Sequence, residues 1–208
     1  ADVIDGKGGA DAIVAGGGND TAYYYGGETS IDGGTGTNSL ILEASAIINL
    51  SNANQLSFGS TTISNFQNVD ASAVSAAVAI TGSSSANVIA GGSGADVIDG
   101  NGGADVVTAG AGNDSVSYRG AEVSLDGGTG TNTLVLKTAA SVDLSAADQT
   151  GADSVNVTNF QNVDASAVSA ATTIVGTSSA NTITGGSGAD AIDGAGGADA
   201  INAGSGND

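Results

Sequence analysis

The chain has 208 residues and a formal net charge of −19, from 22 acidic and 3 basic side chains, with no Cys, His, Pro, Met or Trp. Because phosphate groups are bound by clustered Lys and Arg, this charge argues against nucleic acid and anionic membrane surfaces as partners and favours cations. The absence of Cys excludes disulfides and thiolate metal sites, and no apolar stretch is long enough to predict membrane insertion.

The first element in chain order also begins a long repeat. ADVIDG starts at Ala1 and again at Ala95, ADAIDG starts at Ala189, and each step is 94 residues. NFQNVDASAVSAA keeps this offset, at Asn65 and Asn159. Such self-similarity predicts an array in which each unit packs on its neighbours. We expect one continuous solenoid over residues 1–208, cut from a longer protein, with units at 1–94 and 95–188 and the start of a third at 189–208.

A shorter period of nine residues runs inside each unit. From Gly82 to Val135 the chain reads GSSSANVIA, GGSGADVID, GNGGADVVT, AGAGNDSVS, YRGAEVSLD and GGTGTNTLV. About six residues of a nonapeptide form a glycine-rich turn, and three form a short strand with one aliphatic side chain pointing inward. Two nonapeptides therefore close one coil, and successive coils stack as parallel strands about 4.8 Å apart. The period predicts an all-β fold, a parallel β-roll or β-helix solenoid.

The 40 residues from Leu136 to Val175 leave the nine-residue period, as do residues 42–81. We call these two segments the spacers. Short alternating segments predict strands at 141–144, 154–157, 160–163 and 172–175, arranged in two longer coils with polar turns. Each 94-residue unit would then have about five coils. The alternative is a small independent domain, for which the segment is too short and too poor in large apolar residues.

The turns combine glycine carbonyls with a carboxylate, which are the hard oxygen ligands that divalent cations prefer. Turns on the same side lie 18 residues apart, so two stacked turns can hold an ion between them. For an isolated turn, an Asp that caps its own backbone is the simpler interpretation, but the tandem array favours metal. The candidates at position six of the nonapeptide are Asp2, Asp11, Asp20, Asn38, Asn87, Asp96, Asp105, Asp114, Asn132, Asn181, Asp190, Asp199 and Asp208; those at position nine are Asp5, Asp32, Asp99, Asp126 and Asp193.

GGSGADVID and its neighbours resemble the RTX (hemolysin-type calcium-binding) nonapeptide family, whose consensus is G-G-x-G-x-D-x-U-x with U aliphatic. The resemblance covers residues 1–41, 82–135 and 176–208. It implies a right-handed parallel β-roll, several Ca²⁺ ions in the turns, type I secretion as an unfolded chain, and folding outside the cell. Asn replaces the family Asp at four of the candidate positions, which lowers the ligand charge there. The turn at 118–123 lacks the Asp, and we expect it to hold no metal.

Other features have simpler interpretations. The cluster AYYYGG (22–27) could bind carbohydrate or a partner, but packing at a turn is favoured. Phe66 and Phe160 recur at the 94-residue offset and are expected in the core of a wider coil. Asp70 and Asp164 are expected to cap turns rather than bind metal. The GGTGTN segments resemble threonine ladders of ice-binding solenoids, but they occur once per unit and not in every coil.

Two functions remain open. The first is a secreted, calcium-stabilised structural repeat protein, such as an adhesin stalk, a surface-layer component or a matrix filament, with further copies of its own repeat as partners. The second is the calcium-binding tail of a secreted enzyme or toxin, in which the repeats serve secretion and folding. We expect no catalytic activity in this chain, because it has no His, no Cys and no recognisable nucleophile, and a narrow solenoid offers no deep cleft.

Overall fold

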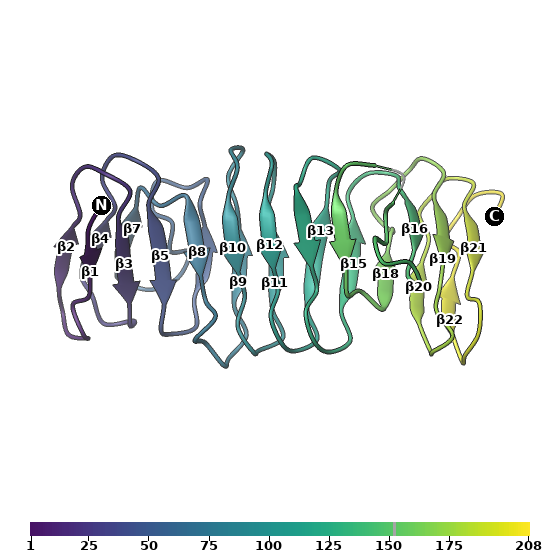
Figure 1. Ribbon diagram of the computed structural model, residues 1–208, viewed down its shortest axis with the longest axis horizontal. Coiled ribbons are helices and arrows are strands. Elements are labelled where there is room, and N and C mark those ends of the chain that lie inside the picture. The colour runs from purple at the N-terminus through teal and green to yellow at the C-terminus, as the bar shows by residue number, and fades with distance from the viewer. Residues whose placement is uncertain (152) are drawn as a thin grey trace.

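The structure, a computed structural model, describes residues 1–151 and 153–208 and consists of 22 short β-strands joined by turns. Figure 1 shows the strands side by side along one axis, with the two termini at opposite ends. The described residues contain no helix, and therefore none that could cross a membrane. The predicted all-β parallel β-roll is confirmed, because every pair of strands runs parallel.

The strands form four parallel sheets, which we number in their order along the axis. Sheet 1 contains β2 (Ala12–Val14), β4 (Ser30–Asp32) and β7 (Thr62–Ser64). Sheet 2 contains β1 (Val3–Ile4), β3 (Thr21–Tyr24), β5 (Ser39–Leu42), β8 (Asn68–Asp70), β10 (Val88–Ala90), β12 (Val106–Thr108), β14 (Ser124–Asp126) and β17 (Asn156–Thr158). Sheet 3 contains β6 (Ile47–Asn49), β9 (Ala79–Thr81), β11 (Val97–Asp99), β13 (Ser115–Tyr118), β15 (Thr133–Leu136), β18 (Asn162–Asp164), β20 (Thr182–Thr184) and β22 (Ala200–Asn202). Sheet 4 contains β16 (Ser141–Asp143), β19 (Thr173–Val175) and β21 (Ala191–Asp193).

The core is a single column of aliphatic side chains between two facing sheets. In a typical three-residue strand only the central side chain is buried, because strand side chains alternate between the two faces. Ile98, Val107 and Leu125 show this, each with 0 % of its side chain exposed. Each such residue contributes about 1.5–3 kcal/mol through burial. Phe66 and Phe160, both 1 % exposed, fill the wider spacer coils, as expected.

The spacers continue the same sheets as the nonapeptides. The second spacer forms strands at β16, β17, β18 and β19, each within two residues of its predicted position. β17 pairs with β14 and β18 with β15, so strands of the spacer and of the nonapeptide region share their sheets. The offset between paired residues is 29 from Thr133 to Asn162 and 20 from Val163 to Ile183, against 18 in the nonapeptide coils. The prediction of longer coils is therefore confirmed.

Each spacer also replaces one face of the roll, which the sequence analysis did not anticipate. Between β5 and β8 the chain makes two strands instead of one, so this coil has three sides. β7 is the last strand of sheet 1, and β6 is the first strand of sheet 3. The roll before the spacer is built from sheets 1 and 2, and the roll after it from sheets 2 and 3. The second spacer repeats the exchange, because β17 ends sheet 2 and β16 begins sheet 4.

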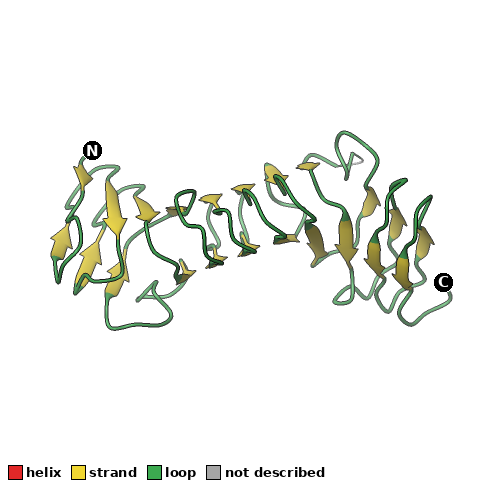
Figure 2. Cartoon of the chain, turned by 90° about the horizontal axis from the view of Figure 1, so that it is seen from below, coloured by secondary structure: helices red, strands yellow, loops and turns green. Residues whose placement is uncertain are grey.

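This exchange changes the direction in which the strands run. In Figure 2 the strands of the middle roll are seen almost end-on, whereas those near both ends lie closer to the plane of the picture. The repeat unit also does not contain a whole number of coils, so successive units begin on different sheets. Sheet 2 takes four coils to pass from β1 to β10, and half a coil more brings the chain to β11 on sheet 3, where Val97 is the counterpart of Val3. Four and a half coils therefore make up each unit, close to the expected five.

Candidate metal centres in the turns

The glycine-rich turns stack on one another as closely as the strands do. The N–H of Ala111 donates to the carbonyl of Gly92 at 2.9 Å, and the N–H of Thr129 donates to that of Gly110 at 2.9 Å. Gly110 has a φ of +104°, and a Cβ placed on it would lie 2.2 Å from the Gly92 oxygen. Glycine is therefore required there both for its conformation and for the close approach of two backbones.

The side chain at position six connects each turn to the turn 18 residues earlier. Oδ1 of Asp114 accepts the N–H of Asp96 at 2.8 Å, and Oδ1 of Asp105 accepts the N–H of Asn87 at 2.8 Å. In the first unit Oδ1 of Asp20 accepts the N–H of Asp2 at 2.7 Å. The two series run on opposite sides of the roll, as the 18-residue spacing predicts.

Four of these carboxylates leave their second oxygen without a partner. Oδ2 of each is buried and accepts no hydrogen bond; the four residues, which we call the open carboxylates, are Asp11, Asp20, Asp105 and Asp114. Asp20, Asp105 and Asp114 are each 1 % exposed. A buried anionic oxygen without a donor costs several kcal/mol (order of magnitude) unless a positive charge compensates it.

Burial perturbs the protonation of two of the open carboxylates, Asp105 and Asp114. Loss of solvent raises the pKa of Asp105 to about 6, despite the N–H that Asn87 donates to it. Burial also raises the pKa of Asp114, for the same reason. Desolvation disfavours the charged form of a carboxyl group. These two sites therefore favour either a proton or a cation at the unpartnered oxygen.

A calcium ion fits this arrangement, with most of its ligands drawn from the backbone. Within residues 1–151 and 153–208, no three Asp, Glu, His or Cys side chains come together as a metal-binding group. Ca²⁺ takes six to eight oxygens and accepts backbone carbonyls and water beside carboxylates. The open carboxylates would supply the charged ligand, and the carbonyls of the stacked turns would supply the neutral ones. Bound calcium would neutralise the buried charge and hold two turns together.

Two candidate carboxylates are closed by their own turns. Oδ2 of Asp96 accepts the N–H of Gly92 at 2.7 Å, and Oδ2 of Asp190 accepts the N–H of Gly186 at 2.7 Å. Their Oδ1 atoms accept the N–H of Val78 and Thr172. Burial alone would raise the pKa of Asp190, but these hydrogen bonds hold it below its usual value. Both oxygens of the two closed carboxylates are thus satisfied by the protein.

The four asparagines at position six each use the amide nitrogen to donate to a backbone carbonyl. Nδ2 of Asn132 donates to the carbonyl of Gly127 at 2.7 Å, and Nδ2 of Asn87 donates to that of Gln67 at 2.6 Å. Nδ2 of Asn38 donates to the carbonyl of Asn65, and Nδ2 of Asn181 to that of Gln161. Each asparagine turn borders a spacer, and its neutral amide leaves no buried charge there for a cation to balance.

The aspartates at position nine cap the following turn. Oδ1 of Asp99 accepts the N–H of Asn101 at 2.8 Å, which supports the positive φ of +69° at Asn101. Asp99 also forms a two-point ion pair with Arg119, which lowers its pKa against the raising effect of burial. The other four make the same Oδ1 bond to the N–H two residues later: Asp5, Asp32, Asp126 and Asp193. These contacts are those of Asx turns.

The remaining candidates lie near the chain ends. Asp2 and Asp208 are exposed and Asp199 is half-buried. Oδ1 of Asp199 accepts the N–H of Asn181 at 3.0 Å, and Oδ1 of Asp208 accepts that of Asp190 at 2.9 Å. Both therefore continue the two series of the third unit in the same manner as Asp105 and Asp114.

Two kinds of residue that act in the turns were not expected from the sequence. Glu122 accepts three N–H groups of its own turn, from Arg119, Gly120 and Ala121, and Glu28 does the same in the first unit. This closes the turn that was expected to hold no metal. Oε1 of Gln161 accepts the N–H of Asn132 at 2.7 Å, where a turn aspartate or asparagine would otherwise do so. The recurrence of NFQN at the 94-residue offset was the signal for this glutamine.

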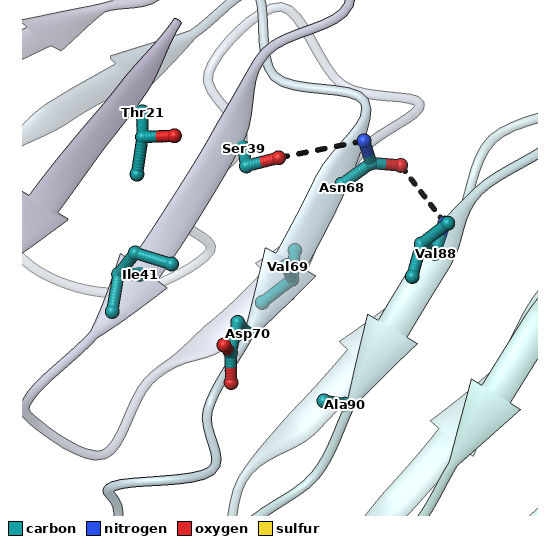
Figure 3. Close-up of a pocket in the computed structure, with 8 residues that line it drawn as sticks. All are labelled: Thr21, Ser39, Ile41, Asn68, Val69, Asp70, Val88 and Ala90. Carbon is teal, nitrogen blue, oxygen red and sulfur yellow. Dashed lines mark hydrogen bonds between the residues drawn. The ribbon is translucent and has the colours of Figure 1, made fainter. Parts of the chain in front are cut away.

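A shallow depression of about 370 Å³ lies on the outer face of sheet 2. It is lined by Thr21, Ser39, Ile41, Asn68, Val69, Asp70, Val88 and Ala90 (Figure 3). Three of its four polar side chains, those of Ser39, Asn68 and Asp70, form hydrogen bonds with the protein. Asn68 contacts Ser39 and accepts the N–H of Val88, and Asp70 caps the N–H of Ser72 at 2.9 Å, as was expected of it.

Comparison with known proteins agrees with the geometry of the turns. The chain matches the family model for the RTX calcium-binding nonapeptide repeat (4 copies) over residues 1–31, 81–116 and 175–208. All four open carboxylates lie inside these ranges, and residues 32–80 and 117–174, which include most of both spacers, lie outside them. A comparison with curated proteins found no match.

Proposed function

Residues 1–31, 81–116 and 175–208 belong to the RTX calcium-binding nonapeptide-repeat family, and from that premise we propose that the chain is a secreted structural element that calcium makes rigid. Its role is to span distance outside the cell, as part of an adhesin stalk, a surface layer or a matrix filament. It carries out no catalysis.

The observation that supports this proposal most is that the described chain forms one elongated stack. Spacers and nonapeptides share their sheets, so no segment stands apart as a separate body (Figure 1). The core is one column wide, and the depression on sheet 2 is shallow. A chain built in this way gains length with each repeat and no deep pocket.

The charge of the chain supports a role for calcium in the rigidity. A net charge of −19 on a narrow rod opposes the compact state through self-repulsion. Calcium bound between turns would remove this repulsion, and its binding free energy would become folding free energy. Proteins of this family are typically secreted, and a chain that folds only with calcium can leave the cell unfolded and become rigid outside.

Stretching single molecules tests the mechanical role directly. The chain is held by its two ends in an optical trap, first in calcium and then in excess EGTA. We expect the calcium-loaded chain to resist until it unfolds abruptly, and the EGTA-treated chain to extend smoothly as a flexible polymer. Smooth extension at low force in both conditions would overturn the mechanical role.

The alternative function is a calcium-binding tail of a secreted enzyme or toxin. The complete reading frame of the parent gene distinguishes it from a structural role. We expect it to encode many 94-residue units in succession. A frame with two such units beside a folded enzyme would favour the tail.

A further inference from the structure

The nonapeptide turns fall into two groups according to what lies beneath them. Four turns rest on a spacer, and we call them starter turns: 82–87, 91–96, 176–181 and 185–190. The N–H of Ser93 donates to the carbonyl of Val74, and the N–H of Ser187 donates to that of Val168, both at 2.9 Å. The other nonapeptide turns with Asp or Asn at position six, from Ala15 onward, rest on another nonapeptide turn, and we call them follower turns: 15–20, 33–38, 100–105, 109–114, 127–132, 194–199 and 203–208.

All four starter turns close on themselves in the same way. The side chain at position six accepts the N–H of the residue four positions earlier, at 2.7 Å in every case. Asp96 bonds to Gly92 and Asp190 to Gly186, while Asn87 bonds to Ser83 and Asn181 to Thr177. The bond occurs on both sides of the roll and in both units. It is therefore a property of the position next to a spacer.

The follower turns lack this bond. Asp20, Asp105 and Asp114 each keep a buried Oδ2 with no partner. The backbones of equivalent turns differ as well. The second glycine has a positive φ in the follower turns, +91° at Gly16 and +104° at Gly110, whereas the starter glycines Gly92 and Gly186 are not in that region. The N–H that closes a starter turn is thus turned away from the carboxylate in a follower turn.

The turn beneath supplies a physical reason for the difference. Beneath turn 91–96 lies the spacer turn around Val74, which has no glycine and whose valine is buried. Beneath turn 109–114 lies turn 91–96, a glycine-rich loop that presents backbone oxygens at close range, such as those of Gly92 and Gly94. Only in the second case do two glycine-rich turns face each other with an unsatisfied anionic oxygen.

We propose that calcium binds only at follower turns that carry an aspartate, between that turn and the turn beneath it, and that the position-six side chains of the starter turns, held by their own hydrogen bonds, bind no ion. Each roll that follows a spacer would then begin on a calcium-independent base. This inference rests on the proposed function, because it assigns the ions that stiffen the rod. It also means that agreement of a nonapeptide with the family consensus does not decide whether its aspartate binds calcium. GGSGADVID, which fits every fixed position, would bind no ion at Asp96, whereas AGAGNDSVS, which departs at position one, would bind one at Asp114.

The test is a crystal structure of the calcium-loaded chain, supported by the ion count of two matched variants. We expect anomalous density beside Oδ2 of Asp105 and Asp114 and none at Asp96. Native mass spectrometry should show one ion fewer for Asp114→Asn and no change for Asp96→Asn. An ion at Asp96 in the wild-type crystal would overturn the inference, whether or not the variant folds. A chain that binds no calcium at all would instead overturn the proposed function.

Discussion

At the scale of single residues, the same position in the stack carries either a charge or a neutral amide. Asp105 presents a buried oxygen without a partner, whereas Asn132 uses its amide to donate to two backbone carbonyls. A buried carboxylate with an unpartnered oxygen needs a cation to balance its charge, whereas the neutral amide of asparagine needs none. The choice between Asp105 and Asn132 therefore decides whether each of these two turns needs a cation.

Replacing these two residues tests that difference. We predict that Asp105→Ala weakens calcium binding at the affected site at least about tenfold, or about 1.4 kcal/mol, because a charged ligand is lost. Asn132→Ala should leave calcium affinity nearly unchanged and lower only the stability of the turn. Isothermal titration calorimetry of both variants measures the effect, and equal losses of affinity would refute this ranking.

The raised pKa of Asp105 predicts opposite pH effects with and without metal. The pKa is about 6 in the folded, metal-free chain and about 3.9 in an unfolded one. The stability from this group is therefore fully present below about pH 3.9 and is lost as the pH rises through about 6. In calcium-free buffer, acidification across this window should increase β-structure in circular dichroism.

With calcium present, the proton and the ion compete for the same oxygen. Calcium affinity should therefore fall as the pH drops below about 6. Calcium titrations at several pH values measure this. An affinity that stays constant across the window would show that Asp105 is not a ligand.

At the scale of the elements, the sequence predicted the positions of the strands better than it predicted which strands pair with one another. The spacer strands were placed within two residues, because alternation of apolar and polar side chains marks a strand locally. Which sheet a strand joins depends on how many residues and sides each coil has. The alternation of side chains along one strand does not contain this information. The three-sided coil and the exchange of faces were missed for this reason.

The candidate metal sites show the same limit. Asp96 and Asp114 look equivalent in the sequence, because each ends a glycine-rich turn. Their second oxygens differ in the structure, because one turn rests on a spacer and the other on a nonapeptide turn. The Glu122 and Gln161 contacts also depend on which backbone groups the fold brings near. Spacing thus identified the ladder of side chains but not the chemical state of each member.

The core of the spacer predicts a large loss of stability when its aromatic side chain is removed. Phe160 is 1 % exposed, so Phe160→Ala should lower the free energy of unfolding in calcium by about 3–5 kcal/mol. The matched control is Phe58→Ala in the first spacer, because Phe58 is 75 % exposed and should change stability by less than about 0.5 kcal/mol. Urea unfolding followed by circular dichroism compares them, and similar values would contradict a core role for Phe160.

The close stacking of turns predicts intolerance to a single methyl group. Gly110→Ala combines a positive φ with a contact of 2.2 Å to the Gly92 oxygen, so the two turns must separate. We expect a clear drop in the melting temperature with calcium bound. Gly102→Ala is the control, because its added Cβ would meet nothing nearer than 3.9 Å and its φ is ordinary. A normal melting temperature for Gly110→Ala would show that the turns do not pack this closely.

At the scale of the whole molecule, the fold is a rod whose faces are exchanged every 94 residues. Two units of four and a half coils and one last coil make about ten coils, or a rod about 48 Å long at about 4.8 Å per coil. The exchange turns each roll relative to the one before it (Figure 2). In a longer array, successive groups of metal sites would therefore face different directions around the axis.

The central claim is that calcium and folding are coupled in this rod, and chelation of the wild-type chain tests it most directly. Circular dichroism and small-angle X-ray scattering are recorded in calcium, after excess EGTA, and after calcium is restored. We expect a β-rich rod in calcium, loss of most β-structure with expansion of the chain in EGTA, and full recovery when calcium is restored. An unchanged spectrum and an unchanged scattering profile in EGTA would contradict it.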